Sequence, residues 1–126
     1  MNFDDFGLTV AGQVHFAATE TIQVKPQVVR AFVEATLEGW KAAIKNPSEA
    51  TTAYVKNFPV LRPTVVERQL TLYFDYIDSK KTRGKSLGWQ SEVDWQETQE
   101  LALQTGTIKR KEPVERYFTN RFIPGS

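Results

Sequence analysis

Few side chains in this sequence have types that could carry out acid–base or nucleophilic chemistry. His15 is the only histidine and there is no cysteine, which excludes a histidine cluster for a metal, a thiolate ligand and a cysteine nucleophile. His15 shares one face of an alternating segment with Gln13, a pattern more typical of an ordinary sheet or interface position than of catalysis. We therefore predict a protein that is not an enzyme and that holds no metal or cofactor.

The acidic residues form no recognisable pair of a general acid and a general base. Asp75 with Asp78, and Glu97 with Glu100, have a helical spacing that usually decorates a solvated helix face. We assign them no chemistry.

A basic run lies between two aromatic residues, a mixture that in principle suits single-stranded nucleic acid or phosphate. It comprises Lys80, Lys81, Arg83 and Lys85, flanked by Tyr76 and Trp89. The net charge is only +1, so a solvated loop is the favoured interpretation and no nucleic-acid partner is expected. Gly84-Lys85-Ser86 lacks the earlier glycine and the preceding strand of a phosphate-binding loop, which excludes that motif.

Length and composition predict one domain over residues 1–126, because 40% apolar content can build a single hydrophobic core. The N-terminal residues include two early acids and no basic or apolar run, so they do not have the pattern of a secretory signal. As written, the chain is expected to stay in the cytoplasm. The apolar runs are far shorter than the roughly 18–20 residues of a membrane span, so no membrane insertion is expected.

Periodicity predicts a mainly helical α+β fold with one N-terminal strand and about four helices. Apolar residues alternate over residues 8–17, the pattern of a half-buried strand. Three- and four-residue spacing and proline starts predict helices from Pro26 to Lys45, from Pro47 onward, and over the segment that contains Val66 and Ile77. A fourth helix is predicted from about Glu92 to Thr105. The spacing predicts a shared core of Phe32, Trp40, Leu70, Tyr73, Phe74 and Trp95.

A lone strand leaves its backbone donors and acceptors unpaired, so residues 8–17 are expected to need a partner. An antiparallel pair of identical strands is self-complementary across a two-fold axis. We therefore predict a homodimer that forms through residues 8–17.

The order of several short motifs resembles one family of solute-binding proteins, those for thiamine precursors, nitrate, taurine and sulfonates. The matching segments are Asp5-Phe6-Gly7, the helix start at Pro26 with Gly39-Trp40, the Asn46-Pro47-Ser48-Glu49-Ala50 start, Leu87-Gly88-Trp89 with Trp95, and the closing segment from Tyr117 to Pro124. Each motif alone is common, because proline at helix starts and glycine at helix ends occur in many proteins. Their order and spacing across nearly the whole chain make the resemblance fairly specific.

The resemblance implies the C-terminal part of one lobe of a type 2 periplasmic binding protein, a fold of about twice this length whose N-terminal part is expected to be missing. It implies ligand-binding roles for Asp5, Phe6 and Gly7, although a solvated segment is the favoured interpretation of Asp5 from the residues alone. Full-length relatives of this kind are periplasmic or lipid-anchored.

The function that the resemblance implies is that of a non-catalytic domain derived from the solute-binding protein of an ABC transporter. Its ligand would be a small molecule such as a thiamine pyrimidine precursor or a sulfonate. Two alternatives stay open: a fragment of an enzyme that makes the pyrimidine precursor, and an interaction subunit completed by a separate N-terminal partner chain.

Overall fold

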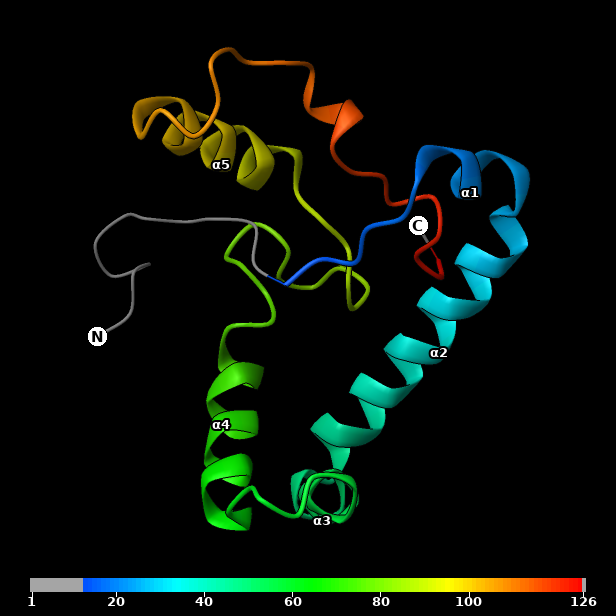
Figure 1. The fold of residues 1–126 in the computed structure, drawn as a ribbon, viewed down its shortest axis with the longest axis vertical. Helices are drawn as coiled ribbons and strands as arrows, with labels where there is room; N and C mark the ends of the chain where they lie inside the picture. The colour runs from blue at the N-terminus through cyan, green and yellow to red at the C-terminus, as the bar shows by residue number, and fades with distance from the viewer. Residues whose placement is uncertain (1–12, 126) are drawn as a thin grey trace.

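The computed structural model describes residues 13–125, which form a helical fold without a strand in this part of the chain (Figure 1). The elements in chain order are α1 (Thr19–Val24), α2 (Pro26–Lys45), α3 (Pro47–Asn57), α4 (Pro63–Asp75), α5 (Glu92–Gln104) and the short 3-10 helix η2 (Val114–Arg116). None of the described helices is long and apolar enough to cross a membrane.

The predicted α+β class and its N-terminal strand are wrong. Residues 14–18 have no regular secondary structure, and residues 8–12 of the expected strand lie outside the described residues. The physical reason is that alternation stabilises a strand only when a neighbouring strand pairs with it. His15 instead places its ring edge-on against Phe32 of α2, with the ring centroids 5.2 Å apart. The expected homodimer would form by strand pairing through residues 8–17. The described part of this segment, residues 13–17, contains no strand that could form that pairing.

Local chemistry explains where the helices begin. Proline stands at the first position of α2, α3 and α4, where its missing N–H costs nothing and its fixed φ suits the helix. At the start of α3 the Asn46 side chain accepts a hydrogen bond from the Glu49 backbone N–H (3.3 Å) and donates one to the Glu49 carboxylate (3.0 Å). This reciprocal cap is the stabilising device that the Asn-Pro-x-Glu motif predicts.

The helices form two arms joined at one end (Figure 1). The long α2 runs down one side, α3 packs against both α2 and α4, and α4 returns along the other side. Helix α5 and the segment that follows it lie at the far end, where η2 packs on α5. The C-terminal residues come back to the N-terminal half of α2.

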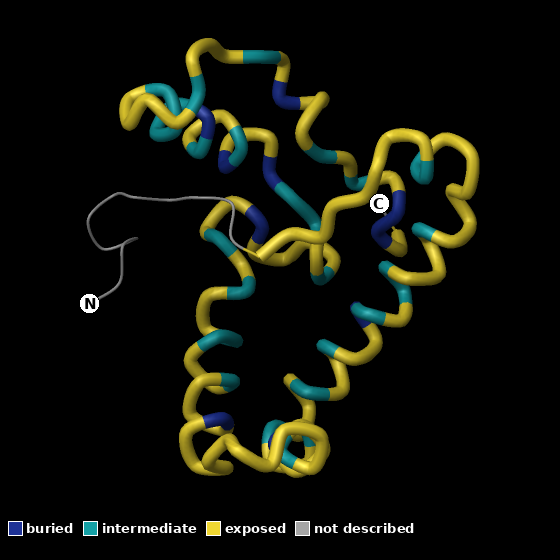
Figure 2. Tube along the Cα trace, viewed as in Figure 1, coloured by how far each residue is buried: buried dark blue, intermediate teal, exposed yellow. Residues whose placement is uncertain are grey.

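Burial is spread over several small centres (Figure 2). The buried apolar side chains of the described residues are Leu37, Val66, Val114, Phe122 and Ile123. One centre forms where α2, the loop before α5 and the C-terminal segment meet. There a Cβ atom added to Gly88 would lie 2.8 Å from Leu37 Cδ2 and 3.4 Å from Ile123 Cδ1, so only glycine leaves room for this contact.

The predicted shared aromatic core is wrong as a single cluster. Trp40, Tyr73 and Phe74 do come together, but Phe32 is 55% exposed. Trp95 packs elsewhere, against Tyr117 and Phe118. The spacing along each helix indicates which of its sides is apolar. Which aromatic side chains contact one another depends on how the helices cross.

Candidate functional site

The ligand-binding residues expected from the resemblance, Asp5, Phe6 and Gly7, lie outside the described residues. The candidate site is therefore built from the side chains of residues 13–125. Three groups have a defined geometry: an aromatic cluster between α2 and α4, a polar network between a loop and α5, and a hollow on α5.

The aromatic cluster, which we term the aromatic bridge, consists of Trp40, Tyr73 and Phe74. The rings of Trp40 and Tyr73 stack with their centroids 5.1 Å apart and their planes 19° from parallel. Phe74 meets Trp40 edge-on at 6.3 Å and 86°. All three side chains are half-buried. The bridge therefore links the two arms, and the rest of the chain covers its three residues only in part.

A polar group extends the aromatic bridge toward the N-terminal side of the described chain. The Tyr73 hydroxyl donates a hydrogen bond of 2.9 Å to Oε1 of Gln13. Burial raises the pKa of Tyr73 above its ordinary value of 10.0, because the charged phenolate would be desolvated there. The hydroxyl therefore stays protonated at neutral pH and acts as a donor. Flat ring surfaces beside one amide and one hydroxyl suit recognition of a planar polar heterocycle.

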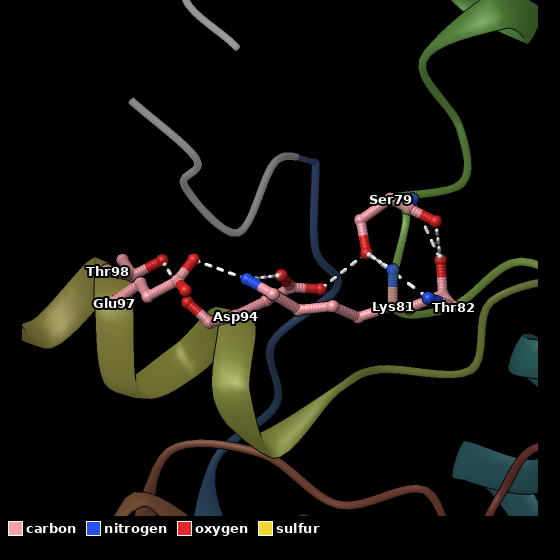
Figure 3. A network of polar contacts seen from close by, with 6 residues as sticks. All are labelled: Ser79, Lys81, Thr82, Asp94, Glu97 and Thr98. Carbon is pink, nitrogen blue, oxygen red and sulfur yellow. Dashed lines mark hydrogen bonds and ion pairs between the residues drawn. The ribbon is translucent and has the colours of Figure 1, made fainter. Parts of the chain in front are cut away.

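The polar network joins the loop at residues 79–82 to α5 (Figure 3). Ser79 Oγ donates to Asp94 Oδ2 (2.7 Å) and accepts the backbone N–H groups of Lys81 (3.1 Å) and Thr82 (3.2 Å). The Lys81 ammonium lies 3.1 Å from Asp94 Oδ1 and also pairs with the Glu97 carboxylate. The Thr82 hydroxyl accepts the backbone N–H of Ser79 (2.8 Å), which closes the turn.

This network fastens the loop and has no arrangement for catalysis. The hydrogen bond to Glu97, followed by contacts with Asp94, raises the pKa of Lys81, so the ammonium stays charged and cannot act as a base at neutral pH. Ser79 Oγ already donates to a carboxylate, with no histidine beside it. Sequence reasoning placed Lys81 in a solvated loop and missed the ion pair, because a loop-to-helix contact leaves no periodic signal.

A shallow hollow of about 460 Å³ lies along the exposed side of α5. Its lining is mixed in polarity and comprises Val93, Gln96, Glu97, Gln99, Glu100 and Lys111. Lys111 forms an ion pair with Glu100 across the hollow, and this contact lowers the pKa of Glu100. Because Glu97 is already paired with Lys81 and Glu100 with Lys111, the hollow offers weaker recognition features than the aromatic bridge. The described residues also include no group of three or more His, Cys, Asp or Glu side chains placed to hold a metal ion.

Comparison with known proteins adds an independent line of information. Residues 1–50 match the family model described as NMT1/THI5 like. The chain is 30% identical over 126 aligned residues to the riboflavin-binding protein RibY of Chloroflexus aurantiacus. That alignment covers 97% of this chain and 35% of RibY, so the chain spans about a third of the length of this relative. No solved structure matches the chain.

Proposed function

We propose that this chain is a non-catalytic piece of a binding protein for a planar heterocyclic solute, a proposal supported by the match of residues 1–50 to the NMT1/THI5-like family model and by the similarity to RibY. The relationship supports a solute-binding origin. The proposal adds three points: the identity of the ligand, the role of the aromatic bridge in binding it, and the contribution of further polypeptide to the binding site.

The observation that carries the proposal is the half-buried pair of stacked rings, Trp40 and Tyr73, in the aromatic bridge. Aromatic rings favour offset stacking on planar partners, and a buried or half-buried hydroxyl sets the orientation of such a partner. Trp40 and Tyr73 provide the stacking faces, and the Tyr73 hydroxyl with the Gln13 amide provides polar groups at one edge. The bridge contains no cation, so a neutral ring system fits it better than nitrate or a sulfonate.

Among planar solutes we propose riboflavin first and a thiamine pyrimidine precursor second. The name of the relative RibY supports riboflavin, whose tricyclic ring offers a large stacking surface. The resemblance to thiamine-precursor proteins supports the pyrimidine, which has one ring. Stacking energy grows with the shared ring area, so the bridge is expected to bind the larger ring system more tightly.

The test is a titration of riboflavin with the purified chain, followed by quenching of flavin fluorescence. We expect saturable quenching, and we expect Trp40→Leu to weaken it at least about tenfold because a branched aliphatic group cannot stack. Trp95→Leu is the matched control, since Trp95 stacks on Tyr117 and Phe118 in a different cluster. Circular dichroism checks that both variants are folded.

Three results would count against the proposed function. The first is an absence of saturable quenching by the folded chain. The second is equal binding by wild type and Trp40→Leu. The third is an equal loss in both tryptophan variants, because that result indicates a general loss of stability. A parallel titration with an aminopyrimidine decides between the two ring systems.

A further inference from the structure

Two arginine side chains converge on one aromatic ring at the point where the C-terminal segment returns to α2. The guanidinium carbon of Arg30 lies 5.9 Å from the centroid of the Phe122 ring, and that of Arg121 lies 4.5 Å from it. Phe122 is buried, with 5% of its surface exposed, whereas both arginines are exposed. The ring therefore forms the floor of a small cationic surface that faces solvent.

The positions of both guanidinium groups are held by the protein. Arg121 Nη2 donates a hydrogen bond of 2.8 Å to the carbonyl oxygen of Ile22 in α1, the short helix that precedes α2. Arg30 Nη2 approaches the carbonyl oxygen of Arg121 at 3.4 Å, a longer and weaker contact. Stacking on the ring and these contacts reduce the side-chain freedom that binding a ligand would otherwise remove.

The two positive charges lack a carboxylate partner within residues 13–125. Among the other basic side chains of this region, Lys81, Arg110, Lys111 and Arg116 each pair with a carboxylate and the rest do not, so what distinguishes Arg30 and Arg121 is that both approach one buried ring. A guanidinium has several N–H donors in a planar fork, and the carbonyl contacts engage only one nitrogen of each. Both groups therefore retain donors for an acceptor from outside.

From this geometry we infer that Arg30, Arg121 and the Phe122 ring form a binding site for a small soluble oxyanion, such as a phosphate or carboxylate group. An oxyanion relieves the repulsion between the guanidinium groups and accepts charge-assisted hydrogen bonds from them. Arg30 precedes Trp40 by ten residues on α2, about 15 Å along the helix axis at the usual rise. The oxyanion site is thus separate from the aromatic bridge and does not depend on the proposed function.

The experiment is an NMR titration of the purified chain with inorganic phosphate, with sodium chloride adjusted to hold the ionic strength constant. We expect saturable shifts confined to the amides around Arg30 and Arg121. Arg30→Gln should weaken binding at least about tenfold, and Arg30→Lys should recover only part of it, because a lysine keeps the charge but loses the planar fork. Arg68→Gln, an exposed arginine on α4, is the matched control and should bind phosphate like the wild type.

Three kinds of outcome overturn the inference. Shifts that do not saturate, or that appear equally around all basic residues, indicate screening of charge and no site. Equal binding by Arg30→Gln and by Arg68→Gln places the anion elsewhere. Sedimentation of the chain with anionic phosphatidylglycerol vesicles, without binding of free phosphate, assigns the surface to a membrane. Acetate and methanesulfonate in place of phosphate show which oxyanion geometry the two arginines prefer.

Discussion

The side-chain amide of Asn120 forms two hydrogen bonds with the backbone of Gln90, thirty residues earlier in the chain. Asn120 Oδ1 accepts the Gln90 backbone N–H at 2.9 Å, and Asn120 Nδ2 donates to the Gln90 carbonyl oxygen at 2.8 Å. The Gln90 side chain in turn accepts the indole N–H of Trp95 at 2.7 Å. The Asn120 side chain therefore pairs with the Gln90 backbone as the backbone of a neighbouring strand would. This pairing connects the C-terminal segment to the residues just before α5.

Asn120→Ala should lower the free energy of unfolding by about 1–3 kcal/mol, because the half-buried Gln90 N–H and C=O groups lose their partner. Urea denaturation followed by circular dichroism measures this loss. Asn57→Ala is the control, since the Asn57 side chain makes a local and exposed hydrogen bond to the Ala53 carbonyl. If the two substitutions lower the free energy of unfolding by the same amount, the pairing of Asn120 with Gln90 stabilises the fold no more than a local, exposed hydrogen bond does.

Gly88→Ala should destabilise the fold more than Gly84→Ala. Both glycines have a positive φ, +84° and +81°, so alanine carries a backbone cost of about 1–2 kcal/mol at either position. Only at Gly88 does the new methyl group collide with Leu37, whereas the space around Gly84 is open. The difference between the two melting temperatures isolates the packing contribution. Combining Gly88→Ala with Leu37→Val should recover part of the stability, and an unchanged loss contradicts the contact.

Trp40→Ala should destabilise the fold by about 2–3 kcal/mol, somewhat less than truncation of a fully buried aromatic residue, because Trp40 is half-buried. A double-mutant cycle with Tyr73→Ala measures the stacking directly. We expect a coupling energy of about 0.5–1.5 kcal/mol for this pair. A coupling energy near zero would show that the aromatic bridge does not hold the two arms together.

The ion pair between Glu100 and Lys111 should make a pH-dependent contribution to stability. The contact lowers the pKa of Glu100 in the folded chain below the ordinary value of 4.5. The contribution is therefore present above pH 4.5 and is lost as the pH falls through the lower pKa of the folded state. The difference in melting temperature between wild type and Glu100→Gln should be small, since both groups are exposed, and should shrink below pH 4.5. A difference that does not change with pH contradicts this assignment.

The starts of α2 and α3 could be predicted from sequence because their causes are local. Pro26 and Pro47 each occupy a first helical position, and the Asn46 side chain caps α3 through Glu49. The short α1 and the start of α4 at Pro63 were not predicted. The ion pair of Lys81 with Asp94 and the contact of Arg121 with Phe122 could not be predicted. Both join residues whose approach depends on how a loop or the C-terminal segment returns to a helix.

The starts of α2 and α3, and the similarity of residues 1–50 to the NMT1/THI5-like family model, follow from the sequence alone, because caps, proline starts and motif order lie in short stretches of chain. Tertiary structure alone decided the fate of the alternating segment and the partners of the aromatic residues. His15 packs on a helix because a strand is stable only beside another strand, which periodicity cannot supply. Trp40 and Trp95 have similar helical surroundings in sequence, yet the crossing of the helices and the path of the C-terminal segment place them in separate clusters.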